Sequence, residues 1–172
     1  MRHAEHFKKL TEGQDRHIAP SQCAATTVLA APADGLLEEP ELIVATSCEK
    51  TLISAPDVYN DRGHAHAVKA GDTIYTSAQI PVDKNGNLPS EEFEAQAEQV
   101  FLNLGSVLKA ARASWSQVVK MNTYLRRRED YATLVGIRDR YMPESSVVVT
   151  DLVSGPVDPR FLLQAECVVA TS

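Results

Sequence analysis

One stretch of the sequence has a regular spacing of apolar residues that limits what the chain can fold into. Apolar side chains recur there at intervals of three and four, at Phe93, Ala97, Val100, Leu104, Val107, Leu108 and Ala111. This spacing predicts an amphipathic helix of about 20 residues with one buried stripe. Ser90 is the expected N-cap, and the acids Glu91 and Glu92 complement the helix dipole. The rest of the chain must supply a surface that covers the stripe.

Segments with β-strand character surround this helix. Strands are predicted at residues 51–53, 66–68, 73–77, 118–125, 146–150 and 161–170. A second helix is predicted from its cap at Asp130 to a stop at Pro143. There are too few helices for a doubly wound parallel sheet, so the order predicts an α+β fold, a mixed sheet with both helices on one face. Oligomerisation is the usual way to cover the other face of such a sheet.

The first 50 residues differ in composition from the rest. They are rich in small and polar residues and contain one short apolar run, residues 42–45. We therefore expect an N-terminal extension, residues 1–50, that is either disordered in part or adds a strand, followed by one domain, residues 51–172.

Charge and composition exclude several classes of function. The chain has 17 Lys and Arg against 23 Asp and Glu, a net charge of −6, which disfavours nucleic acid as a partner. The dense basic run 126–128 is followed at once by acids and is expected to be a solvated turn. No apolar run is long enough to cross a membrane, and the first residues fit neither a secretory signal nor a transit peptide. Three cysteines without ligand or disulfide spacing favour a cytoplasmic location.

Motifs for cofactors and metals are missing from the sequence. It has no nucleotide-binding, zinc-protease or esterase motif, so we expect no cofactor. His64 and His66 are two residues apart, and on a strand both rings would lie on one face. Because no third ligand lies nearby, we expect surface or interface histidines and no metal site.

Glu166 is the residue with the most informative position. It lies in the apolar strand 161–170 and shares a strand face with Leu162, Gln164 and Val168. A carboxylate buried there must meet a partner, a cavity or solvent. The pattern leaves two alternatives, an edge-strand glutamate facing water or a carboxylate of raised pKa that positions or activates water. Ser77, taken alone, is an ordinary serine at the end of a strand.

Four blocks of sequence follow one another across residues 51–170. They are Thr76–Asp83 with Gly86, Gln96–Leu104, Val118–Lys120 and the strand of Glu166. Together they resemble the Rid/YjgF family, the reactive intermediate deaminases. The resemblance implies a chorismate-mutase-like fold in which three subunits close into a barrel, with active-site clefts between subunits. It also implies hydrolysis of 2-enamines and 2-imines to 2-oxo acids and ammonia, without a cofactor.

The resemblance also assigns roles to individual residues. Glu166 matches the glutamate that orients the attacking water, and Ser77 matches the site serine. Three other positions differ from the family pattern. The tyrosine falls on His64, the glycine after the serine falls on Ala78, and the asparagine of the second helix falls near Val135.

The largest departure concerns the arginine that grips the substrate carboxylate in the family. Its position falls on Ser145, in the run Pro143-Glu144-Ser145. Serine cannot replace a two-pronged charged contact, and Glu144 would repel the same carboxylate. Arg160, six residues before Glu166 and expected on the same strand face, is a candidate replacement, the alternative being a surface arginine at the start of the strand.

The resemblance, together with the departures from it, implies a cofactor-independent hydrolase of the deaminating kind. It would act on a small enamine- or imine-like metabolite at clefts of a homotrimer, without the 2-iminopropanoate activity typical of the family. Glu166 would handle water, with Ser77 in the site and His64 as a second acid or base. The alternative is a non-catalytic trimer that binds a small molecule or assists another enzyme.

Overall fold

The computed structural model describes residues 43, 48–60, 64–143, 147–156 and 158–171. Within these ranges the strands are β1 (Lys50–Ile53), β2 (Ala67–Ala70), β3 (Thr73–Thr76), β4 (Val118–Leu125), β5 (Val148–Val153) and β6 (Leu163–Ala170). The helices are α2 (Phe93–Ala110) and α3 (Tyr131–Tyr141), with short 3-10 turns at Trp115–Gln117 and Arg128–Asp130. The expected extension, residues 1–50, lies outside the described residues except for 43 and 48–50.

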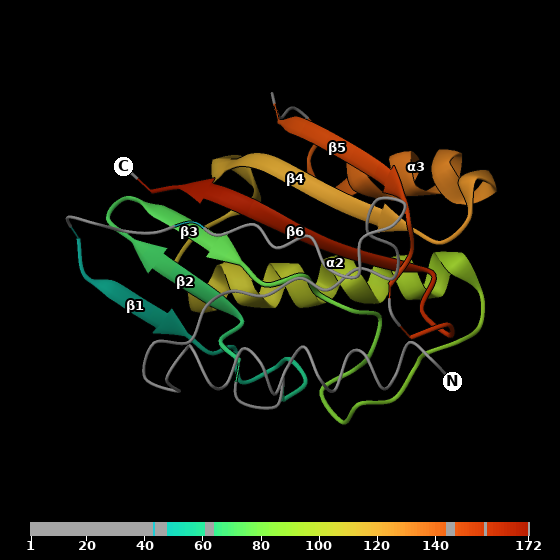
Figure 1. Cartoon of the computed structure of the whole chain (residues 1–172), viewed down its shortest axis with the longest axis horizontal. Coiled ribbons are helices and arrows are strands. Elements are labelled where there is room, and N and C mark those ends of the chain that lie inside the picture. The colour runs from blue at the N-terminus through green and yellow to red at the C-terminus, as the bar shows by residue number, and fades with distance from the viewer. Residues whose placement is uncertain (1–42, 44–47, 61–63, 144–146, 157, 172) are drawn as a thin grey trace, which may run out of the picture.

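The strands form one mixed sheet, as the sequence predicts (Figure 1). Their order is β1-β2-β3-β6-β4-β5, and β4 and β5 pair in parallel while the other neighbours pair antiparallel. Helix α3 connects the parallel pair, because parallel neighbours need a crossover connection. The C-terminal strand β6 therefore lies in the interior of the sheet, between β3 and β4.

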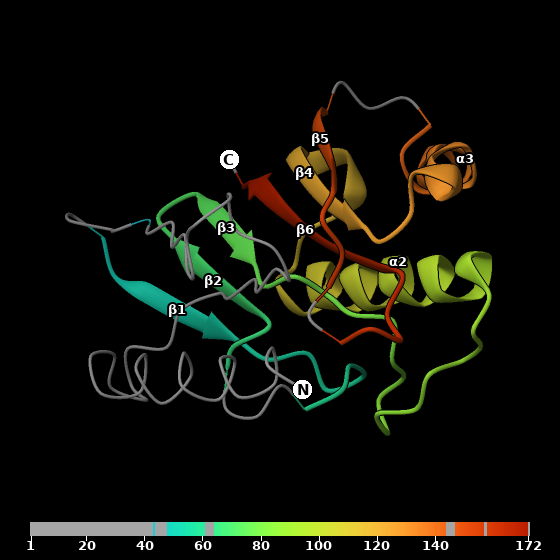
Figure 2. The same cartoon turned by 45° about the vertical axis from the view of Figure 1, so that its right-hand side comes forward.

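Both helices lie on one side of the sheet (Figures 1 and 2). Asp151 of β5 accepts hydrogen bonds from Arg138 of α3, at 2.9 and 3.2 Å. Asp151 is paired in register with Thr123, and Thr123 with Ala165, so all three share a face. Ala165 in turn belongs to the hydrophobic core with the buried residues of α2. Among the described residues, the opposite face of the sheet carries no helix.

Helix α2 buries the predicted stripe. Of the stripe residues, Ala111 is partly buried and follows the helix, and the others are buried. The start of the helix differs from the prediction, because Glu92 and not Ser90 is the N-cap. The Ser90 hydroxyl accepts the backbone N–H of Glu92 at 3.0 Å and so stabilises the turn before the helix.

Two polar residues also lie on the buried side of α2, and they hold the neighbouring loops. Gln96 donates to the carbonyls of Ser90 and Arg160 and accepts the N–H of Leu162 at 2.8 Å. Asn103, two turns later, donates to the carbonyls of Ile80 and Val82. Buried backbone groups need such partners when no strand or helix supplies them.

The basic run is exposed at Arg127 and Arg128, as the charge pattern predicts, but not at Arg126. Arg126 is half-buried, and its guanidinium donates to the carbonyls of Pro156, Asp158 and Phe161. Asp130 is the N-cap residue of α3, as predicted, but its side chain makes no capping hydrogen bond and instead accepts two hydrogen bonds from Arg127. Arg126 therefore fixes the loop that leads into β6, and Arg127 the turn that leads into α3.

We predict that Gln96→Ala lowers the free energy of unfolding by about 2–3 kcal/mol, because it leaves the buried Leu162 N–H and two carbonyls without this partner. Urea unfolding at a fixed protein concentration measures the change. Gln99→Ala is the matched control, since Gln99 is half-buried and, among the described residues, its amide hydrogen-bonds only to Asn103 within the same helix. It should cost less than about 1 kcal/mol. Equal losses in the two variants would contradict the role given to Gln96.

Candidate functional site

Glu166 lies on the side of the sheet that faces away from the helices. In β6, Ala165 and Cys167 are buried in the core, so the alternation of the strand directs Glu166 to the other face. There its Oε1 atom accepts a hydrogen bond from the Asn122 side-chain amide and another from the Tyr124 hydroxyl, both at 2.9 Å. Because β6 is an interior strand, the alternative of an edge-strand glutamate is wrong, and Glu166 meets two polar partners.

On the other side of Glu166, the pairing of β3 with β6 becomes irregular. Tyr75 pairs with Val168, and the next pairing joins Gln79 to Ala165. Three residues, 76–78, thus span the distance that 166 and 167 span on β6. An extra residue of this kind bends a strand and redirects side chains, and such irregularities are frequent next to active sites. Ser77 therefore lies in the segment beside Glu166.

The side chain of Ser77 already has a structural partner. Ser77 is fully buried, and its hydroxyl donates to the carbonyl of Ala65 at 2.6 Å, while its N–H donates to the carbonyl of His66 at 2.9 Å. Ala78, which follows it, is also buried. Ser77 thus joins the end of β3 to the residues before β2.

The two histidines have different environments. His66 is buried, its Nδ1 accepts the N–H of Ala55 at 2.9 Å, and its Nε2 lies 2.8 Å from the carbonyl oxygen of Tyr59. The expectation of a surface or interface histidine is therefore wrong for His66, which holds the loop 55–59 in place. His64 is half-buried just before β2. Within the described ranges no group of three His, Cys, Asp or Glu could hold a metal ion.

The remaining predicted site residues lie elsewhere. Val135 is half-buried in α3, on the helix side of the sheet. Arg160 precedes β6 and is exposed, so the expectation that it shares the strand face of Glu166 is wrong. Its guanidinium binds Asp158, and these hydrogen bonds lower the pKa of the Asp158 carboxyl. Ser145 lies outside the described residues.

Sequence reasoning missed the two residues that contact Glu166. Asn122 and Tyr124 stand two positions apart in β4 and so share a face. Their polarity within a strand was a usable signal, but the sequence does not reveal that β4 and β6 are neighbours. A tyrosine and an asparagine thus meet the glutamate from β4, whereas the positions implied by the resemblance hold His64 and Val135.

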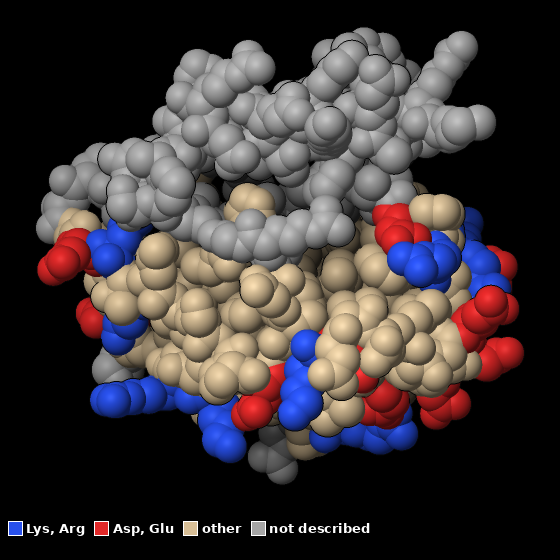
Figure 3. Space-filling view, turned by 90° about the horizontal axis from the view of Figure 1, so that it is seen from below, with Lys and Arg blue, Asp and Glu red and all other residues tan. Residues whose placement is uncertain are grey.

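Charged residues of both signs are mixed on the face shown in Figure 3. Lys and Arg lie beside Asp and Glu along its rim, and its middle carries neither. Within the part of the chain that is described, no helix is long and apolar enough to cross a membrane.

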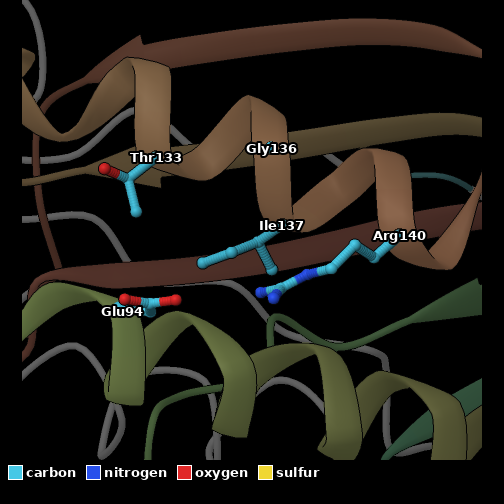
Figure 4. Close-up of a pocket in the computed structure, with 5 residues that line it drawn as sticks. All are labelled: Glu94, Thr133, Gly136, Ile137 and Arg140. Carbon is cyan, nitrogen blue, oxygen red and sulfur yellow. The ribbon is translucent and has the colours of Figure 1, made fainter.

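A shallow groove of about 290 Å³ lies between the two helices (Figure 4). Glu94 of α2 and Arg140 of α3 line it, together with Thr133, Gly136 and Ile137. The guanidinium of Arg140 binds Glu98. Because both helices lie on the covered side of the sheet, this groove is separate from the surroundings of Glu166.

Comparison with known proteins identifies the family. A family model described as Endoribonuclease L-PSP matches residues 54–157. The chain belongs to this family, which is also called YjgF/Rid. The mixed sheet with its two helices is accordingly the chorismate-mutase-like fold that the resemblance implies.

Named relatives and solved structures agree with this assignment. The mitochondrial protein mmf1 of Schizosaccharomyces pombe is 31% identical over 61% of this chain and 64% of its own length. The chloroplastic Reactive Intermediate Deaminase A of Arabidopsis thaliana is 28% identical over 73% of this chain and 68% of its own length. The crystal structure of RidA from an Antarctic Psychrobacter is similar at a TM-score of 0.65 and 29% identity, covering 70% of this chain and 98% of RidA. The chain thus spans about two-thirds of the length of these curated relatives.

Cys167 follows Glu166 in sequence, but its thiol is buried in the core on the opposite face of the sheet and is not placed to act as a nucleophile beside Glu166. Burial in the core, with the nearby charge of Glu166, raises the pKa of its thiol to about 12. We predict that alkylation of the folded protein at neutral pH modifies the exposed Cys48 and spares Cys167. Peptide mass spectrometry before and after denaturation measures this. Equal labelling of the two thiols in the folded protein would contradict the assignment.

Proposed function

We propose that this protein is a cofactor-independent hydrolase that deaminates a small enamine- or imine-like metabolite at clefts between subunits of a homotrimer. In this reaction one water adds to the C=N carbon and gives one proton to Glu166. Glu166 then passes that proton to the nitrogen, and the carbon–nitrogen bond breaks as the remaining hydroxyl proton also moves to the nitrogen, which releases ammonia and a carbonyl product and returns Glu166 to its starting form. Chemistry of this kind needs a base and a water, and no redox group.

The observation that carries the proposal is the carboxylate of Glu166. It lies half-buried on the face of the sheet opposite the helices, and two neutral donors fix one of its oxygens. A general base works best when its orientation is set before the substrate arrives. The names of related proteins support the reaction class, because relatives in Arabidopsis thaliana and Dermatophagoides farinae are called deaminases, the latter a 2-iminobutanoate/2-iminopropanoate deaminase.

Exposed apolar residues support the proposed assembly. Leu52 of β1 and Val148 and Leu152 of β5 are 42%, 63% and 42% exposed. The register places them on the face of the sheet opposite the helices. Large apolar side chains on an uncovered sheet face favour contact with further copies of the chain, which would put Glu166 close to a subunit boundary.

A second function, a trimer that binds a small molecule without turnover, is favoured by one observation. The Ser77 hydroxyl is buried and donates to a backbone carbonyl, so it is engaged in holding the fold.

An endoribonuclease, which the family description names, is a weaker candidate for this chain. Its net charge is −6, and binding of phosphates depends on clustered Lys and Arg.

We predict weak or no acceleration of 2-iminopropanoate hydrolysis, because Ser145 stands where the family has its carboxylate-binding arginine. Losing such charged hydrogen bonds costs about 1.5–3 kcal/mol, or roughly 10- to 100-fold in rate. The test compares ammonia release from 2-iminopropanoate, made by an amino-acid oxidase, with release from carboxylate-free imines made by an amine oxidase. Faster turnover of 2-iminopropanoate would contradict the prediction.

The variant Glu166→Gln should abolish hydrolysis of any imine that the wild type accepts, because an amide cannot take the proton from water. Initial rates of ammonia release measure the loss. Glu94→Gln, the same change at an exposed position of α2, is the matched control and should leave the rate unchanged.

Sedimentation of both variants should give the trimer of the wild type. Unchanged rates in Glu166→Gln would exclude Glu166 as the base. A wild-type monomer at micromolar concentration would instead contradict the location of the site between subunits.

A further inference from the structure

We propose that Tyr124 and Asn122 are positioning residues that keep Glu166 oriented and ionised. The inference deepens the proposed function and rests on it, since it concerns how the same site is kept ready for hydrolysis. Neither residue is expected to touch the substrate.

The geometry places both donors on one acceptor. The Tyr124 hydroxyl and the Asn122 amide each lie 2.9 Å from Oε1 of Glu166. Asn122 is the register partner of Glu166, and Tyr124 follows it by two residues on the same face of β4. Both β4 and β6 are interior strands of the sheet, and Tyr124 is only 6% exposed. Donors on rigid, paired strands restrict the carboxylate to one orientation.

Two hydrogen-bond donors on one oxygen also favour the ionised form of the Glu166 carboxyl. Hydrogen bonds to the charged form of a carboxyl favour that form, and such charge-assisted bonds are stronger than neutral ones. A general base must be deprotonated to accept a proton from water. Removing either donor should therefore raise the pH at which Glu166 becomes active.

Other titratable or charged groups that face Glu166 could also change its protonation, and the experiment must distinguish them from the two donors. Tyr75 is the titratable residue on the paired part of β3, and Lys120 is the charged residue on β4 before Asn122. Arg126 continues the same alternation on β4 but binds the carbonyls of the loop before β6. Within β6 the neighbours on this face, Gln164 and Val168, do not titrate. Lys120 is exposed, and its positive charge would favour the ionised carboxylate too.

The first experiment is the pH dependence of kcat/KM for Tyr124→Phe, with the imine that the wild type hydrolyses best. We expect the acid limb to move up by about one pH unit and kcat to fall with KM little changed. Tyr75→Phe removes a hydroxyl from the same face without touching Glu166 in any described contact, and its limb should stay at the wild-type pH. Asn122→Leu should move the limb in the same direction as Tyr124→Phe. Identical profiles for wild type and Tyr124→Phe would overturn the proposal.

The second experiment follows the protonation of Glu166 itself and needs no turnover. In protein labelled with ¹³C at the glutamate carboxyls, the Glu166 signal is assigned by its absence in Glu166→Gln. Its titration midpoint should rise in Tyr124→Phe and in Asn122→Leu and stay fixed in Tyr75→Phe. A midpoint that moves in Lys120→Met but not in Tyr124→Phe would overturn the proposal in favour of the lysine charge.

The two experiments fail independently. If the wild type hydrolyses no imine but the Glu166 midpoint rises in Tyr124→Phe, the positioning role stands and the proposed reaction is wrong. If the wild type hydrolyses imines and neither the limb nor the midpoint moves, the reaction stands and the positioning role is wrong.

Discussion

The register of β6 is the constraint on which the rest of the molecule depends. The strand lies between β3 and β4, and every second residue packs into the core that α2 covers. A slip of one residue would turn each side chain to the opposite face. It would bring Glu166 into the apolar core and Cys167 out of it, at the cost of burying a charge without its donors. The hydrophobic contact with α2 therefore also sets the position of the carboxylate next to Asn122.

The loop before β6 is held by hydrogen bonds from two elements, and these contacts help to fix where β6 begins. Gln96 of α2 binds Arg160 and Leu162 through their backbone groups, and Arg126 at the end of β4 binds the carbonyl of Phe161. Gly155, at the start of this loop, has a positive φ of 70°, and a Cβ there would lie 3.3 Å from the Cα of Arg126. Polar residues that look like surface residues in the sequence thus fix the chain where a regular strand cannot.

The sequence predicted the parts of the fold that depend on local periodicity. Residue spacing was sufficient for the stripe of α2, the order of the elements and the mixed sheet, because amphipathic patterns report burial directly. It was insufficient where a residue's partner is distant along the chain. His66 is buried because Ala55 and Tyr59 supply its ring partners, and Glu166 meets Asn122 because β4 and β6 are neighbours, which no local pattern encodes. For the same reason, the number of subunits and the substrate stay predictions.

The charges around Glu166 bear on which substrates the proposed reaction can use. An ionised carboxylate repels a substrate carboxylate unless a cation lies between them. Arg160, the candidate replacement, binds Asp158, which offsets its charge, and Ser145 carries none. A neutral imine avoids this repulsion, and its protonated form, an iminium cation, is attracted to Glu166 while it becomes more reactive toward water. In the proposed reaction the negative charge of Glu166 would stabilise the positive charge on the electrophile until the proton is transferred, so the absence of the arginine and a glutamate base favour the same class of substrate.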